Sequence, residues 1–231
     1  MLTLAFDTSS QTASIALLRD DVIIYDVVIN SGINHSEVLL TAIDEACRHT
    51  GVKTEDIDLF ACTLGPGSFT GLRVGISTLK GLLFAAGKPA VGVSTLEALA
   101  LNVKGNAEVI CSVMDAGRGQ VYTACYSCDG KGFLNRLCPE RVLDPNEIVL
   151  NDMSQDTIFV GEGAVKYSEI LMEKSKKVKI ACSMQQYIRA SAVGILGREK
   201  FFRNELLSPA GFVPVYLRSA DAQPGRGLFE H

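Results

Sequence analysis

The sequence predicts an α/β fold made of two successive halves, each with the element order β-β-β-α-β-α and a mixed sheet covered by helices. Two observations support this prediction. Each half opens with three short runs rich in β-branched residues, and segments with helical spacing follow them. The order of elements then restarts after residues 103–106, Val-Lys-Gly-Asn, although no sequence identity between the halves is detectable. The sequence therefore predicts a pseudo-duplicated protein.

In the first half, tight turns separate the first three predicted strands, and Gly51 marks the end of the helix that follows them. A buried strand then leads through Gly65-Pro66-Gly67 into a long helix, for which Ser68 is well placed as the N-cap. The predicted elements are strands at 2–6, 12–18, 22–29, 57–64 and 90–93, and helices at 36–49, 69–86 and 95–102.

The second half repeats this order with weaker signals. The predicted elements are strands at 108–115, 120–126, 157–160 and 178–182, a less regular strand at 133–143, a weak helix after Pro145, and helices at 164–172 and 189–202. Residues 219–231 contain Pro224, Gly225 and Gly227 and are expected to form a mobile tail. We expect residues 1–103 to form an N-terminal subdomain and residues 104–231 a smaller C-terminal one.

Composition indicates a globular chain that does not grip nucleic acid by itself. Hydrophobic residues make up 47% of the 231 residues, which is ample material for a core. The formal net charge is −4, whereas proteins that neutralise many phosphates usually carry a basic face. The basic cluster Lys174, Lys176, Lys177 and Lys179 is typical of a solvated surface.

The cysteines and the chain start favour a cytoplasmic location. Seven cysteines occur at scattered positions, mostly in apolar stretches, where reduced thiols pack like small hydrophobic groups. Cys125 and Cys128 have the spacing of a redox pair but end a predicted strand, so they and Cys138 are interpreted as core packing or chance, with their role left open. The start meets Asp7 too early for a signal peptide, and no apolar run reaches the ~20 residues of a membrane span.

The segment 65–75, Gly-Pro-Gly-Ser-Phe-Thr-Gly-Leu-Arg-Val-Gly, is the most informative stretch. It places a strand, a glycine turn and a helix N-terminus in succession, an arrangement that can hold an anion. The Gly-Lys-Ser/Thr ending of a phosphate-binding P-loop is absent, which favours a structural or docking loop. Gly71, Gly75 and Thr78 share one helix face. That face can serve internal packing against helix 36–49 or pairing with another protein.

This segment resembles the signature of the bacterial TsaB (YeaZ) family. The similarity continues through almost the whole chain, in order, at Asp7-Thr8-Ser9, His35-Ser36-Glu37, Met114-Asp115-Ala116 with Val121-Tyr122, and Pro214-Val215-Tyr216-Leu217-Arg218. The resemblance implies the actin/Hsp70/sugar-kinase-like (ASKHA) fold, in agreement with the two predicted halves.

The resemblance also implies the function. Members of the family are non-catalytic subunits required for N6-threonylcarbamoylation of the adenosine beside the anticodon in tRNA. They bind a TsaD-like catalytic subunit together with a TsaE-like ATPase, form a homodimer when alone, and meet tRNA only through the complex. No cofactor is expected. The expected partner-binding residues are His35, Gly65, Pro66, Gly67, Ser68, Phe69, Thr70, Gly71, Arg73, Gly75 and Thr78.

Two features of the first half separate the chain from its enzymatic relatives. TsaD-like proteins carry His-x-x-x-His, which binds a metal, but Leu39 stands four residues after His35, so no metal is expected. Asp7-Thr8-Ser9 falls where kinases of this superfold place a phosphate loop, yet the expected glycine is absent. We interpret it as a vestigial nucleotide loop, with Asp7 either a turn former or a residue that orients magnesium.

Two enzymatic alternatives remain. A small-molecule kinase or ATPase would use Asp7 in the cleft between the halves, although the second half is small for a sugar kinase. A metallopeptidase would need a His-Glu-x-x-His motif, which the chain lacks. The sequence does not tell whether a nucleotide binds at the partner interface, whether the homodimer and the heterodimer use the same helices, or which residues contact tRNA.

Overall fold

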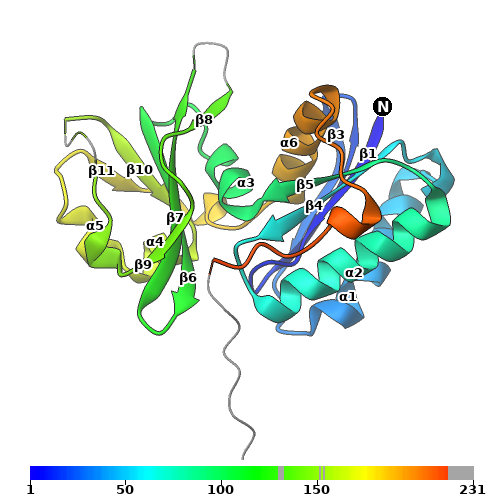
Figure 1. The fold of residues 1–231 in the computed structure, drawn as a ribbon, viewed down its shortest axis with the longest axis horizontal. Coiled ribbons are helices and arrows are strands. Elements are labelled where there is room, and N and C mark those ends of the chain that lie inside the picture. The colour runs from blue at the N-terminus through cyan, green and yellow to red at the C-terminus, as the bar shows by residue number, and fades with distance from the viewer. Residues whose placement is uncertain (130–132, 151, 153, 218–231) are drawn as a thin grey trace, which may run out of the picture.

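The structure is a computed structural model that describes residues 1–129, 133–150, 152 and 154–217. Two mixed β-sheets stand beside each other with helices between them and outside them (Figure 1). The first sheet has the strand order β3-β2-β1-β4-β5. Its strands are β1 (Leu2–Asp7), β2 (Ala13–Arg19), β3 (Val22–Ile29), β4 (Leu59–Gly65) and β5 (Ala90–Ser94), and the helices α1 (His35–Thr50) and α2 (Phe69–Ala86) and the 3-10 turn Thr54–Asp56 connect them.

Both faces of the first sheet are buried. Leu4 and Phe6 of β1 pack in the cluster beneath α1 and α2, whereas Ala5 packs in the cluster shared with the helices between the sheets. Central strands covered on both faces are apolar along their whole length rather than alternating. This burial explains why residues 2–6 are apolar except for Thr3.

The second sheet repeats the topology of the first. Its order β11-β10-β6-β7-β8 matches that of the first sheet when β6 is equated with β1, which confirms a pseudo-duplicated α/β protein. The elements are β6 (Val109–Gly117), β7 (Gln120–Cys128), β8 (Leu134–Arg136), β9 (Arg141–Leu143), β10 (Thr157–Val160), β11 (Val178–Ile180), the helices α4 (Glu162–Lys166) and α5 (Ser168–Met172), and the 3-10 turns Pro145–Glu147 and Ser183–Gln185.

Three predicted elements of the second half are wrong in detail. Residues 133–143 form two short strands, β8 and β9, which both pair with β7. The helix expected after Pro145 is a single 3-10 turn, because Asp144 and Glu147 close a capping box around it within four residues. The helix expected at 164–172 is divided into α4 and α5. Segments this short carry too little periodicity to fix their type.

Two helices, α3 (Thr95–Leu101) and α6 (Ala190–Phe202), lie between the sheets. Helix α3 packs on β6 and β7, whereas α6 returns to pack on β1, β2, β4 and β5. Gly194 and Gly197 permit this close approach, since a Cβ on Gly197 would lie 2.7 Å from the Ala61 methyl group. We propose that the subdomain boundary near residue 103 separates the two sheets and that residues 190–217 rejoin the first subdomain.

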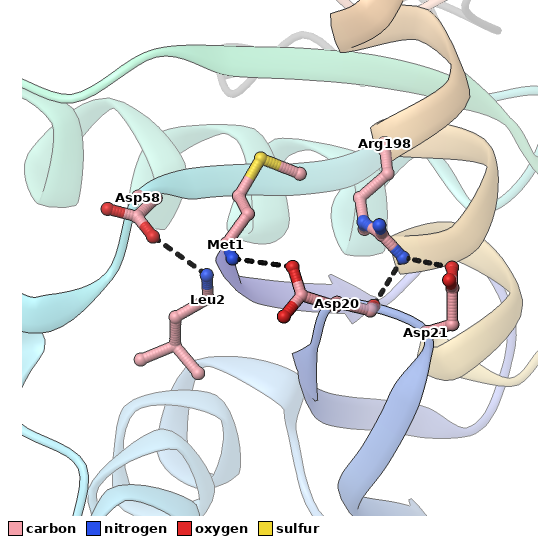
Figure 2. Close-up of polar contacts among 6 residues, drawn as sticks. All are labelled: Met1, Leu2, Asp20, Asp21, Asp58 and Arg198. Carbon is pink, nitrogen blue, oxygen red and sulfur yellow. Dashed lines mark hydrogen bonds and ion pairs between the residues drawn. The ribbon is translucent and has the colours of Figure 1, made fainter.

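Polar contacts fix α6 and the chain start to the edge of the first sheet (Figure 2). Arg198 donates to the carbonyl of Asp20 and to the Asp21 carboxylate, the latter at 2.6 Å. The amino group of Met1 pairs with the Asp20 carboxylate at 2.7 Å, and Leu2 N donates to Asp58 at 2.8 Å. The Met1 contact lowers the pKa of Asp20. One turn between β2 and β3 therefore meets both the chain start and α6.

The sequence-based expectation that every cysteine is a free thiol is wrong for two of the seven cysteines. Cys111 of β6 and Cys125 of β7 are register partners and form a disulfide, with their Cα atoms 4.2 Å apart. The two residues lie 14 positions apart in sequence, so only the pairing of β6 with β7 brings them together.

No helix in the described part of the chain has the length and apolar character needed to cross a membrane. The predicted mobile tail, 219–231, and Arg218 lie outside the described residues.

Candidate functional site

The glycine-proline-glycine turn joins β4 to α2 as the sequence predicts. Ser68 caps α2, since its Oγ accepts a hydrogen bond from Gly71 N at 3.2 Å. Gly65 has a φ of +118°, and a Cβ there would lie 2.6 Å from the carbonyl oxygen of Val215. Val215 N in turn donates to Leu64 O at 2.7 Å. Glycine at position 65 therefore lets residues 212–217 cross directly over the turn.

The turn between β1 and β2 packs on the first two turns of α2. Thr8 Oγ1 donates to Gly71 O at 2.7 Å, and Ser68 N donates to Ser9 O at 2.7 Å. A Cβ on Gly71 would overlap the carbonyl oxygen of Thr8, and one on Gly75 would lie 2.6 Å from Thr8 Oγ1. Both glycines are buried. They serve internal packing, and their nearest partner is the β1–β2 turn, while His35 of α1 would lie 3.4 Å from a Cβ on Gly71.

Asp7 closes the base of the same turn and is fully buried. Its Oδ1 accepts hydrogen bonds from Ser9 N at 3.1 Å, Ser9 Oγ at 2.5 Å and Thr63 Oγ1 at 2.5 Å. Its Oδ2 has no hydrogen-bond partner among the described residues. Burial raises the pKa of the Asp7 carboxyl, and the hydrogen bonds from Ser9 and Thr63 oppose that rise. The geometry favours the interpretation of Asp7 as a turn former.

Replacing Asp7 with asparagine is expected to change how stability depends on pH. A folded-state pKa above the unfolded value of 3.8 means that the native chain binds the extra proton, so wild-type stability falls as pH rises through that window. The asparagine side chain would accept the same hydrogen bonds without a charge. The free energy of unfolding of the Asp7→Asn variant minus that of the wild type should therefore increase from about pH 4 upward and then level off. Urea unfolding across pH measures this difference, and a flat difference would contradict the assignment.

His35 begins α1 and joins it to the β1–β2 turn. Its Nε2 lies 2.8 Å from the carbonyl oxygen of Ser10, and the ring is half-buried. Leu39, one helical turn later, is buried in the core beneath α1. Within the residues that the structure describes, no group of three or more His, Cys, Asp or Glu side chains is placed to hold a metal ion. The contact with Ser10 makes His35 a link between α1 and the β1–β2 turn.

A cleft of about 900 Å³ opens between the two halves. Its lining includes an aromatic stack, in which Phe69 and Tyr216 have ring centroids 5.1 Å apart. The Arg73 guanidinium lies 3.8 Å from the centroid of Phe69, and its Nε donates to Tyr216 OH at 3.3 Å. Figure 1 shows the segment after α6 running along α2 toward this region. The lining residues include Ser9, Ser10, Thr12, His35, Ser68, Asp115, Tyr122, Glu162, Lys166, Tyr187 and Tyr216.

The wall that the second half contributes is rich in charge. Lys166 Nζ pairs with Asp115 Oδ2 at 2.7 Å, and this hydrogen bond raises the pKa of Lys166. Glu162 faces the cleft beside them, and burial raises the pKa of its carboxyl. Carboxylates on this wall repel an incoming phosphate, and Lys166 is already paired with one of them.

The outward face of α1 and α2 is a separate candidate surface, because these helices lie side by side on the outside of the first sheet (Figure 1). Phe84 of α2 is 95% exposed, and Leu40 of α1 is 58% exposed. Thr70, Arg73, Ser77 and Gly81 precede Phe84 at intervals of three or four residues and are all exposed, so they form one stripe. A Cβ on Gly81 would meet nothing within 4 Å.

Comparison with known proteins assigns the family. The family model described as TsaD: tRNA N6-adenosine threonylcarbamoyltransferase matches residues 29–225. The tRNA threonylcarbamoyladenosine biosynthesis protein TsaB of Bacillus subtilis is 32% identical over 226 residues, which cover 96% of each chain. The chain belongs to the TsaB (YeaZ) family. This assignment confirms the resemblance on which the sequence-based expectations rest.

Solved structures of TsaB (YeaZ) family members and more distant proteins share the fold. The structure of YeaZ from Pseudomonas aeruginosa superposes with a TM-score of 0.82 at 28% identity, covering 94% of this chain and 99% of that one. Component A of the (R)-2-hydroxyglutaryl-CoA dehydratase of Acidaminococcus fermentans gives a TM-score of 0.53 at 14% identity, covering 87% and 98%. The α/β ASKHA fold predicted from the sequence is confirmed.

The sequence-based site residues of this TsaB-family chain separate by exposure. The buried members other than Gly65 and Pro66 form the contact between the β1–β2 turn and α2, and the exposed members are the N-cap and the first turns of α2. The buried residues are Asp7, Thr8, Ser9, Gly65, Pro66, Gly71 and Gly75, the half-buried ones are His35, Gly67 and Thr78, and the exposed ones are Ser68, Phe69, Thr70 and Arg73.

Several residues of the cleft and of the helix face were not predicted. Phe84 and Gly81 continue the exposed stripe. Phe84 could have been identified from the sequence, since it is an aromatic residue outside the buried face of an amphipathic helix. Glu162 and Lys166 gave no signal, because α4 is too short to show periodicity and the cleft depends on how the two sheets are placed.

Proposed function

We propose that this chain is a non-catalytic subunit needed for N6-threonylcarbamoylation of the adenosine beside the anticodon in tRNA. It acts by binding and supporting a TsaD-like catalytic subunit. Family membership supports the pathway, since the Bacillus subtilis relative is named as a threonylcarbamoyladenosine biosynthesis protein. The observation that carries the accessory role is the loop Asp7-Thr8-Ser9, in which Asp7 Oδ1, Thr8 Oγ1 and Ser9 O are hydrogen-bonded inside the chain to Thr63, Gly71 and Ser68.

This internal bonding leaves little for a nucleotide to use. A phosphate loop must offer free backbone N–H groups to the ligand, but Ser9 N donates to Asp7 and Ser68 N donates to Ser9 O. Across the cleft, Asp115 and Glu162 present carboxylates. These features favour the accessory subunit over the kinase alternative, in which Asp7 would orient magnesium.

The same features predict that ATP has little effect on the isolated chain. Adding ATP with magnesium at about 1 mM should shift the melting temperature by less than about 1 °C, because a ligand stabilises only in proportion to its occupancy of the folded state. Differential scanning fluorimetry measures this shift. An increase of several degrees that disappears in Asp7→Asn would favour the kinase alternative instead.

The proposed partner surface is the outward face of α1 and α2. Phe84 is 95% exposed, and the small residues Gly81 and Ser77 precede it on the same stripe. Small residues beside an exposed aromatic side chain suit the close approach of a partner helix. Of the sequence-based set, Phe69, Thr70 and Arg73 can contact a partner directly. The buried glycines at 65, 71 and 75 instead shape α2 by packing it on the β1–β2 turn.

The remaining partners follow from the same proposal. A TsaE-like ATPase joins the complex, a second copy of the chain occupies the helix face when the TsaD-like subunit is absent, and tRNA binds only through the complex. The net charge of −4 supports this last point, because a chain with a negative balance does not hold tRNA phosphates strongly on its own. A tRNA-directed role also favours the cytoplasm as the compartment.

Size-exclusion chromatography with light scattering tests the proposal. The purified chain is mixed with the TsaD-like protein of the same organism, and each is also run alone. A discrete mixed complex is expected, together with a homodimer of this chain by itself. Absence of a mixed complex at micromolar concentrations would overturn the accessory role.

A further inference from the structure

Three cysteines gather on the second sheet, outside the cleft and the helix face. Cys111 and Cys125 form the disulfide between β6 and β7. Cys138, in the connection between β8 and β9, is a free thiol whose Sγ accepts a hydrogen bond from Cys125 N at 3.3 Å. A free thiol therefore lies next to one end of a disulfide.

The three sulfur atoms differ in accessibility. Cys111 is fully buried in the core beneath α4 and α5. Cys125 and Cys138 both line a pocket of about 390 Å³, whose lining does not include Cys111. The Cys125 end of the disulfide therefore borders an opening that Cys111 does not line, and Cys138 borders the same opening. Cys128 packs against the core between the two sheets and so lies on the opposite face of β7.

We propose that Cys111, Cys125 and Cys138 form an intramolecular thiol–disulfide exchange site. The Cys138 thiolate attacks the sulfur of Cys125, a Cys125–Cys138 bond forms, and the Cys111–Cys125 bond breaks. Cys111 leaves as a thiolate and takes up one proton, which balances the proton that Cys138 gave up. The step involves no net oxidation and no external reagent.

The exchange changes what the disulfide holds in place. In one state it joins β6 to β7, and in the other it joins β7 to the connection that contains Cys138. Two residues after Cys138, the Glu140 carboxylate accepts a hydrogen bond from Ser94 Oγ at the end of β5. Ser94 also caps α3, since its Oγ accepts from Glu97 N at 3.2 Å. The connection that contains Cys138 therefore lies beside a contact between the two halves.

Peptide mapping of acid-quenched protein tests the exchange. The full chain is purified without reductant, incubated between about pH 6 and 8, quenched in acid, alkylated and digested with trypsin. Cleavage after Lys104, Arg118, Lys131, Arg136 and Arg141 places Cys111, Cys125 and Cys138 in three different peptides. The experiment uses Cys128→Ser as the background, because Cys128 shares a tryptic peptide with Cys125.

The expected result is a Cys125–Cys138 linked peptide, with alkylated Cys111, that accumulates faster as the pH of the incubation rises, because the thiolate is the attacking form. Cys138→Ser in the same background should keep Cys111 linked to Cys125 and unlabelled at every pH. If Cys138 alone is alkylated in the parent at all times, or if all three cysteines are alkylated, the proposal is wrong. Matching thermal melts of the two proteins exclude unfolding as the cause, and Cys138→Ala serves as a second variant should the serine variant melt early.

Discussion

Gly71→Ala is expected to lower the free energy of unfolding by about 3 kcal/mol, the upper end of the usual cost of overpacking a core. The new methyl group would overlap the carbonyl oxygen of Thr8, a backbone atom that cannot rotate away. Moving that turn would also disturb the hydrogen bond from Thr8 Oγ1 to Gly71 O. Urea unfolding followed by circular dichroism measures the loss.

The matched control is Gly81→Ala in the same helix. Position 81 is exposed and a Cβ there would meet nothing within 4 Å, so the variant should gain up to about 1 kcal/mol from helix propensity. Equal effects at both positions would contradict the packing account. Gly75→Leu should yield insoluble protein, because Thr8 Oγ1 occupies the space that the new side chain needs.

Phe84→Asp is expected to weaken binding of the TsaD-like subunit on the order of 30-fold or more, the loss of about 2 kcal/mol that removing an aromatic anchor causes. A charge at a position that becomes buried in the complex adds a desolvation cost. The isolated chain should keep its stability, since Phe84 is 95% exposed. Calorimetric titration against the partner gives the affinity, and thermal melts check the fold.

Met184→Asp supplies the control for Phe84→Asp. Met184 is 78% exposed and lies in the 3-10 turn Ser183–Gln185, away from α1 and α2, so the same change of character there should leave the affinity unaltered. If both variants bind the partner as tightly as the wild type does, the partner surface lies elsewhere on the chain.

The strands and long helices of the first half could be predicted because their signals are local. Residues 2–6 are apolar except for Thr3, since both faces of the sheet are covered, and α2 has a strong cap in Ser68. The return of α6 to the first sheet could not be predicted, because its apolar surface fits either sheet equally well in sequence. Its place follows from tertiary packing, such as that of Gly197 against Ala61 and of Gly194 against Leu18.

The candidate site was predicted in its position and not in its details. The sequence identified the glycine turn and the helix stripe, but both alternatives for Gly71 and Gly75 were consistent with the spacing. Choosing between them required the distance to Thr8, a residue 63 positions away from Gly71. The disulfide between Cys111 and Cys125 likewise depends on strand register, which scattered cysteines do not reveal.

A reconstituted modification assay tests the central claim most directly. It combines the TsaD-like subunit, the TsaE-like ATPase, the threonylcarbamoyl donor and tRNA, with this chain present, omitted or replaced by Phe84→Asp. We expect that modification requires the wild-type chain, fails when the chain is omitted, and needs far more of the variant for the same rate. Equal modification without the chain, or modification by the chain alone, would contradict it.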